Sequence, residues 1–215
     1  MGTATLGPGT VGGVAFLVAL AVNATAGRKL GDSANTASRA AARAGGLTPA
    51  TWAFSIWGII YGLFALGYIL WALQGADTNC PLPWFLVGVW VCNALWVVAS
   101  TQQRWLMAMG LLLCYLAFAI GSVSADLPPT LAAANAVMCL WLVAAMLLNL
   151  QIVLPNKAPF IKNIALPFVF VAALVLGYIN YSTLENKSSV WAASVALLLA
   201  AAWITSTVVS GSDKK

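Results

Sequence analysis

The sequence contains no histidine, and only 7% of its 215 residues are charged. Histidine is the commonest metal ligand and the usual acid–base group of enzymes. Its absence argues against a histidine-based metal centre and against most general acid–base catalysis. An ordinary soluble domain carries about 25% charged residues, and a chain with far fewer cannot cover itself with a water-soluble surface. These two absences exclude a typical soluble enzyme and favour a protein that resides in a lipid bilayer.

Cysteine is also scarce, and its placement predicts no framework of disulfides. Cys92, Cys114 and Cys139 lie within apolar segments, and Cys80 stands alone in a loop without an evident partner. This pattern predicts four reduced, structural thiols. We also expect no metal site, no required cofactor and no catalytic residue, because the apolar segments hold no acid–base pair or activated nucleophile.

Long apolar segments account for the 62% of residues that are hydrophobic. A membrane-spanning helix needs about 20 mostly apolar residues, and breaks at glycine, proline and charge delimit seven such segments. They cover residues 9–27, 51–74, 83–101, 105–125, 130–154, 161–181 and 189–210. The sequence therefore predicts one all-α domain over residues 1–215, a polytopic transmembrane bundle of about seven helices. Residues 9–154 would form a five-helix core, and residues 155–215 two additional helices and a short tail.

The first segment and the connection after it allow more than one reading. Residues 1–22 contain no lysine or arginine, so the positive region of a signal peptide is missing and a retained helix is favoured. The connection at 28–50 holds Arg39 and Arg43, four residues apart and therefore on one face if helical. It would be either a short helix on the membrane surface or a mobile loop.

The basic residues are distributed very unevenly between the two sides of the predicted bundle. One side would carry nine of the ten: Arg28, Lys29, Arg39, Arg43, Arg104, Lys157, Lys162, Lys214 and Lys215. The other side would carry only Lys187. By the positive-inside rule, the N-terminus lies outside and the C-terminus inside, in a bacterial inner membrane or an organellar membrane. The net charge of +5 is then explained without any nucleic-acid partner.

Four of the ten tryptophans, Trp57, Trp90, Trp96 and Trp141, lie deep within predicted helices rather than near helix ends. Tryptophans at helix ends act as interfacial anchors, whereas a buried indole N–H needs a hydrogen-bond partner. Deep tryptophans either pack against one another or form the walls around a flat ligand.

Helical spacing places several of these tryptophans on a face with a polar or small residue. Trp57 and Tyr61 are one turn apart, and Asn93 and Trp96 are three residues apart. An asparagine in the middle of a membrane helix is costly unless it forms hydrogen bonds across helices or to a ligand.

A further stripe on the segment 130–154 repeats every four residues, with Trp141, Ala145 and Asn149. Its large, small and polar members share one face. Three helices would therefore present aromatic and small or polar groups at similar depth, which predicts a convergent cavity.

These residues also resemble a known family. The run from Thr48 to Tyr61, TPATWAFSIWGIIY, is similar to the start of the second helix in the tryptophan-rich sensory protein family, also called the TspO or translocator-protein family. Asn93-x-x-Trp96 is similar to that family's third-helix motif, and Trp141-x3-Ala145-x3-Asn149 to its fifth-helix motif. The resemblance covers roughly residues 47–150. Leu150 and Gln151 stand where animal members have a sterol-associated tyrosine pattern.

The resemblance implies a receptor or carrier for a flat hydrophobic ligand, a tetrapyrrole such as a porphyrin ahead of a sterol. Without histidine, a bound tetrapyrrole would be metal-free or held by its edges. The expected ligand-binding residues are Trp57, Tyr61, Asn93, Trp96, Trp141, Ala145 and Asn149. The alternative function is a non-catalytic structural or assembly subunit of a larger membrane complex. A homodimer and a larger complex are both compatible with the small-residue faces of the helices.

Overall fold

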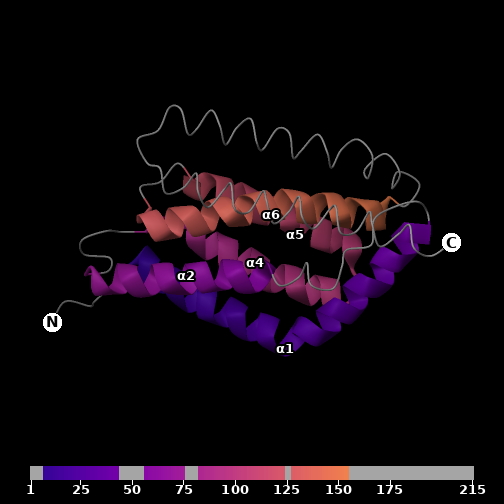
Figure 1. Ribbon diagram of the computed structural model, residues 1–215, viewed down its shortest axis with the longest axis horizontal. Helices are drawn as coiled ribbons and strands as arrows, with labels where there is room; N and C mark the ends of the chain where they lie inside the picture. The colour runs from indigo at the N-terminus through magenta and orange to yellow at the C-terminus, as the bar shows by residue number, and fades with distance from the viewer. Residues whose placement is uncertain (1–6, 44–55, 76–81, 124–126, 155–215) are drawn as a thin grey trace.

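The protein is all-helical in the part of the chain that the computed structural model describes, which is residues 7–43, 56–75, 82–123 and 127–154 (Figure 1). Its helices are α1 (Pro8–Arg43), α2 (Ile56–Leu73), α4 (Phe85–Thr101), α5 (Trp105–Val123) and α6 (Pro129–Val153). The first five predicted helices are therefore present in the predicted order. The predicted helices at 161–181 and 189–210 lie outside the described residues, so the total of seven stays a prediction.

The length and composition of these helices are those of membrane spans. Residues Pro8–Ala26 of α1, all of α2, residues Trp105–Ser122 of α5 and all of α6 are long and apolar enough to cross a bilayer. Helix α4 is equally apolar and has 17 residues, at the lower end of the roughly 17–25 residues that span a bilayer. No aspartate, glutamate, lysine or arginine occurs in α2, α4, α5 or α6. The chain is thus a multi-pass integral membrane protein.

Helix α1 differs from the prediction, because it continues to Arg43 instead of ending near residue 27. The segment after residue 27 is rich in alanine and has no proline before Pro49, so nothing local stops the helix. Figure 1 shows that α1 bends about midway along its length. Asn23 Nδ2 donates to the Ala19 carbonyl at 2.8 Å, and Thr25 Oγ1 donates to the Ala21 carbonyl at 2.9 Å. Such bonds from side chains to the preceding turn bend helices.

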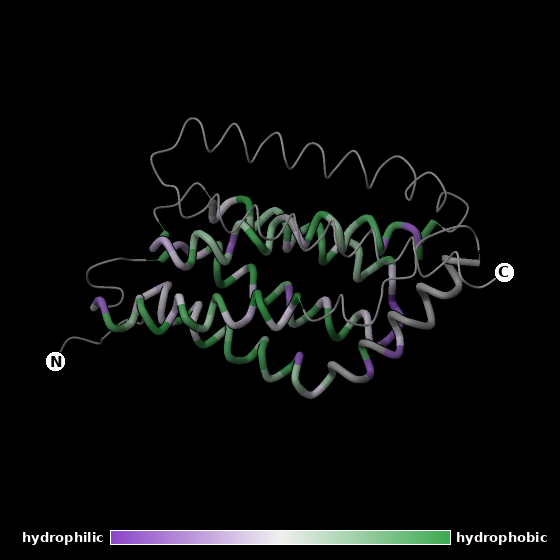
Figure 2. The backbone as a smooth tube through the Cα atoms, in the orientation of Figure 1, coloured by the Kyte–Doolittle hydropathy of each residue, from purple (hydrophilic) through white to green (hydrophobic). Residues whose placement is uncertain are grey.

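The second half of α1 is more polar than the first. Figure 2 shows hydrophobic residues along the spanning helices and hydrophilic residues near helix ends and in the second half of α1. Of the two readings of residues 28–43, the helical one is therefore confirmed. Its position on a membrane surface stays a prediction.

The helices form a bundle in which α4 packs against α1 and α5, and α6 packs against α5 and α2. Consecutive helices α4, α5 and α6 alternate in direction, so α4 and α6 run the same way (Figure 1). The space between α1, α2 and α4 is filled by large aromatic side chains, among them Phe16, Phe64 and Trp90, none more than 3% exposed. This aromatic interior holds most of the predicted site.

The connection from α4 to α5 is a tight turn of three residues. The Arg104 N–H donates to the Ala99 carbonyl and the Gln103 N–H to the Ser100 carbonyl, both at 3.0 Å. This pair of bonds is the Schellman motif that commonly ends a helix. Gln103 adopts φ 58° at the position where glycine is usual. The turn fixes the end of α4, and thereby the height of Trp96 and Ser100 in the bundle.

Candidate functional site

Three tryptophans from three different helices meet in the interior, as the sequence predicted. Trp57 of α2 has its ring centroid 5.5 Å from that of Trp96 on α4 and 6.1 Å from that of Trp141 on α6. Tyr61 stacks on Trp57 at 5.6 Å with an interplanar angle of 23°. We call Trp57, Tyr61, Trp96 and Trp141 the inner aromatic cluster. Its pairs lie within the 4.5–7 Å range at which aromatic rings attract one another.

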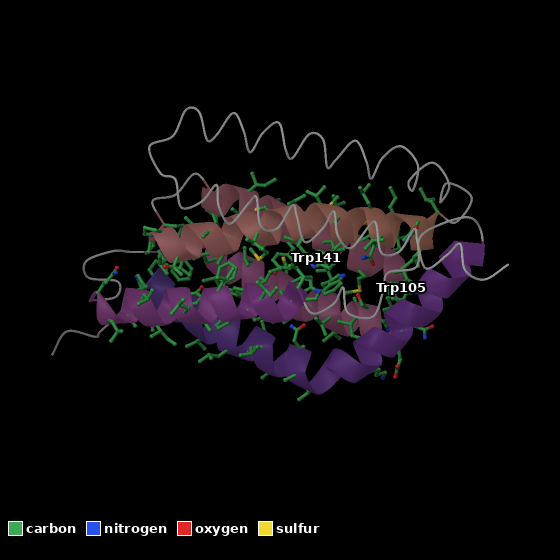
Figure 3. The ribbon with its side chains drawn as sticks, viewed as in Figure 1. Trp105 and Trp141 are labelled. Atoms are coloured by element: carbon green, nitrogen blue, oxygen red, sulfur yellow. The ribbon has the colours of Figure 1, made fainter. Side chains whose placement is uncertain are left out.

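The depth of these rings matches the sequence argument. Figure 3 shows Trp141 near the middle of the bundle and Trp105 towards the end at which α5 begins. Trp141 is buried, whereas Trp84, which precedes α4, is 61% exposed. The deep tryptophans therefore face the interior, and Trp84 has the exposure expected of an interfacial anchor.

Asn93 on α4 is completely buried and joins four other helices through side chains. Its Oδ1 accepts hydrogen bonds from Asn23 Nδ2 of α1 at 2.9 Å and from the Tyr61 hydroxyl of α2 at 3.3 Å. Its Nδ2 donates to the Tyr115 hydroxyl of α5 at 3.4 Å. That hydroxyl donates in turn to Met138 Sδ of α6 at 3.0 Å. We call these five residues the Asn93 network.

The Asn93 network changes the interpretation of two predicted residues. The Oδ1 of Asn93 and the hydroxyl of Tyr61 already have protein partners, so neither atom depends on a ligand for its hydrogen bond. The sequence missed the roles of Asn23 and Tyr115. Asn23 was read only as a polar interruption of the first helix, although a polar side chain in an apolar span is itself the signal for an interhelical bond.

A second group of aromatic residues continues from Tyr61 towards the far end of α2. Trp90 packs edge-on against Phe64 at 4.7 Å and against Phe16 at 4.8 Å. Its indole Nε1 donates to the Tyr68 hydroxyl at 3.1 Å. This deep tryptophan thus has an internal hydrogen-bond partner and acts in packing, which was one of the two predicted roles.

The stripe on α6 lies inside the protein along its whole length. Trp141, Ala145 and Asn149 are all less than 9% exposed. Asn149 Nδ2 donates to the Ala145 carbonyl at 2.8 Å, within the same helix. Its Oδ1 is buried and has no hydrogen-bond partner among the described residues. The amide therefore retains an acceptor for a group outside its own helix.

Two further buried polar atoms have no partner in the described structure, and both belong to the same end of α4. They are the indole Nε1 of Trp96 and the hydroxyl oxygen of Ser100. Other hydroxyls in the bundle bond to their own helix, as Ser122 does to the Phe118 carbonyl at 2.9 Å. A buried polar group without a partner costs about 1–3 kcal/mol, so the end of the site near Trp96 and Ser100 favours a bound polar group.

Within the described ranges, no group of three histidine, cysteine, aspartate or glutamate residues is close enough to hold a metal ion. Cys92, Cys114 and Cys139 have free thiols, and Cys80 lies outside those ranges. The chemistry available in the site is therefore aromatic stacking and neutral hydrogen bonding.

All seven predicted ligand-binding residues are buried, on α2, α4 and α6. Trp57, Tyr61, Trp96 and Trp141 form direct contacts, Asn93 bonds to Tyr61, and Ala145 and Asn149 continue the face that carries Trp141. Whether these residues contact a ligand stays a prediction.

Comparison with known proteins points to one family. The family model described as TSPO-like protein matches residues 10–125, which include α4 and the inner aromatic residues of α2. No curated protein and no solved structure matches the chain. The match ends before α6, so the similarity of Trp141, Ala145 and Asn149 to a fifth-helix motif rests on their spacing and burial.

Proposed function

Because the chain belongs to the TSPO-like protein family, we propose that this membrane protein binds a flat hydrophobic ligand, a tetrapyrrole ahead of a sterol, against the inner aromatic cluster. The observation that carries the proposal is the meeting of Trp57, Trp96 and Trp141 from three separate helices. Flat aromatic faces attract planar ring systems by stacking, and apolar walls with few polar groups are typical of small-molecule sites.

The preference for a tetrapyrrole over a sterol is part of the proposal. A tetrapyrrole is planar and aromatic and can stack on indole rings over a large area, whereas a sterol offers only an aliphatic surface. Leu150 and Gln151 also replace the tyrosine pattern associated with sterols in animal members. The proposed role is binding for transport or sensing rather than catalysis, since α2, α4, α5 and α6 contain no ionisable acid–base residue other than cysteine and tyrosine.

The proposal is tested by titrating protoporphyrin IX into the detergent-solubilised protein and following tryptophan fluorescence. We expect quenching, and we expect Trp57→Phe combined with Trp141→Phe to weaken binding by roughly tenfold, because two stacked indoles contribute about 0.5–1.5 kcal/mol each. Trp84→Phe is the matched control, since Trp84 is exposed and lies outside the cluster. If the double variant kept both affinity and quenching, the assignment of the site would be wrong.

The proposed orientation follows the basic residues, with the N-terminus outside and the turn at Arg104 inside. A membrane-impermeant thiol or amine reagent applied to intact cells should leave a single cysteine introduced at Gln103 unlabelled, in a background lacking the native cysteines. Efficient labelling of that cysteine would reverse the orientation.

The second candidate function, a structural subunit of a larger membrane complex, is supported by the outer face of α2. Gly58 and Gly62 are exposed, and a Cβ at either position would meet nothing within 4 Å. A small-xxx-small face of this kind allows another helix to approach closely. Purification from native membranes separates the two functions: a stoichiometric assembly supports the subunit, and a free monomer or homodimer that binds pigment supports the receptor.

A further inference from the structure

The unpartnered atoms of Trp96, Ser100 and Asn149 lie beyond the inner aromatic cluster, towards the end at which α4 joins α5. Trp96 and Ser100 are one turn apart on the same face of α4. Trp96 and Trp141 both contact Trp57, which places them at one level on helices that run in the same direction (Figure 1). The next turn of each helix therefore brings Ser100 level with Ala145, and Asn149 follows one turn later.

The burial of these atoms distinguishes them from other polar groups of the bundle. Ser100 is 0% exposed, Trp96 5% and Asn149 7%. Trp96 Nε1, Ser100 Oγ and Asn149 Oδ1 each have no partner among the described residues. By contrast, the indole of Trp90 has the Tyr68 hydroxyl and the Ser122 hydroxyl has the Phe118 carbonyl. Three exceptions along two neighbouring faces indicate a shared partner rather than three separate defects.

The chemistry of the three atoms defines what they would bind. The Trp96 indole is a donor only, the Ser100 hydroxyl donates and accepts, and the Asn149 carbonyl oxygen is an acceptor. No charged residue occurs in α2, α4, α5 or α6. An ionised carboxylate buried beside these atoms would have donors but no cation, and an unpaired buried charge is strongly unfavourable.

We infer that Trp96, Ser100 and Asn149 form a subsite for an uncharged oxygen-bearing group, a hydroxyl, ester or amide, at one edge of the flat ligand. This inference rests on the proposed function. It adds a charge preference to it, because a ring system with neutral polar edges fits the site better than the same ring system with free carboxylates. It also adds Ser100, which the sequence had not indicated.

The test compares two probes that differ only in charge, protoporphyrin IX and its dimethyl ester, titrated against the full-length protein in a non-ionic detergent. We expect the ester to bind roughly tenfold more tightly. Ser100→Ala and Asn149→Leu should each lower the affinity for the ester by about threefold to tenfold, the range of one or two neutral hydrogen bonds, and should reduce the preference over the free acid. Ser122→Ala is the matched control, because it removes a buried hydroxyl that already has a backbone partner, and it should change neither value.

The possible outcomes separate this inference from the proposed function. Equal binding of both probes, tighter binding of the free acid, or a preference that survives in Ser100→Ala and Asn149→Leu would overturn the subsite while leaving the aromatic site intact. The last result would mean that water satisfies these atoms. Failure of both probes to bind to the wild-type protein would overturn the proposed function, and the subsite with it. Circular dichroism and gel filtration of each variant establish that it is folded.

Discussion

Asn23 and Asn93, 70 residues apart in the sequence, are joined by a hydrogen bond of 2.9 Å between the Nδ2 of the first and the Oδ1 of the second. The bond links α1 to α4, next to the point at which Tyr61 of α2 reaches the same oxygen. In a bilayer, where the hydrophobic effect drives helix association only weakly, such polar contacts help to set the rotation and height of helices relative to one another. The Asn93 network therefore positions the face of α2 that carries Trp57 and Tyr61.

The strength of this link can be measured with a double-mutant cycle on Asn23→Ala and Asn93→Ala, using the free energy of unfolding in detergent. We expect a coupling energy of about 0.6–1.7 kcal/mol, the range found for interhelical hydrogen bonds in membranes. Asn93→Ala should cost more than Asn23→Ala, because it removes a partner of three side chains, whereas Asn23 keeps its bond to Ala19 in either background. Strictly additive effects would show that the two amides do not interact.

Helices α2 and α6 approach each other most closely at Gly67. A Cβ at this position would lie 2.5 Å from Leu131 Cδ2 and 3.3 Å from the Leu131 backbone nitrogen. Gly67→Ala should therefore destabilise the protein by about 1–3 kcal/mol, as overpacking usually does. Gly62→Ala, on the same helix with nothing within 4 Å, is the control and should leave the thermal midpoint unchanged or slightly higher. Equal midpoints for both variants would contradict this packing of α2 on α6.

The turn between α4 and α5 offers a change that should stabilise the protein. Gln103 has φ 58°, a left-handed conformation that costs a residue with a side chain roughly 1–2 kcal/mol and costs glycine little. Gln103→Gly should accordingly raise the free energy of unfolding by about 1 kcal/mol. Gln102→Gly is the control, because Gln102 has φ −87° and gains nothing from glycine. A loss of stability in Gln103→Gly would show that its side chain has a role outweighing the backbone strain.

Apolar length and breaker residues were sufficient to predict the five described helices, because each span is a continuous hydrophobic run ended by proline, glycine or charge. They were insufficient for the end of α1, where the residues after 27 are polar enough to leave the membrane yet still favour a helix. Length and polarity report on burial in lipid, and neither signals that a helix stops at the membrane boundary.

The site was predictable to the extent that it depends on helical faces. Spacing alone predicted that Trp57, Trp96 and Trp141 converge, and they do. The choice of partners was not predictable, because it depends on how each helix is rotated. The sequence favoured Gly58 and Gly62 as the place of close helix approach, whereas the structure leaves that face open and brings Leu131 against Gly67. Likewise, Asn93 was expected to contact a ligand, and its oxygen instead accepts bonds from Asn23 and Tyr61.

Tyr61 allows the ring and the hydroxyl to be tested separately as sources of ligand affinity. The ring stacks on Trp57 at 5.6 Å, and the hydroxyl donates to Asn93 at 3.3 Å. Tyr61→Phe keeps the ring and removes a bond made within the protein, so it should lower stability by about 0.5–1.5 kcal/mol and leave protoporphyrin affinity within about twofold. Tyr61→Leu removes the aromatic face as well and should weaken protoporphyrin binding by about fivefold, in line with the loss of one aromatic pair. Fluorescence titrations of the two variants beside the wild type give both affinities, and thermal unfolding gives the stabilities. A large loss of affinity in Tyr61→Phe with little loss of stability would mean that the hydroxyl contacts the ligand directly, which would return Tyr61, and with it Asn93, to the polar contacts that the sequence first predicted.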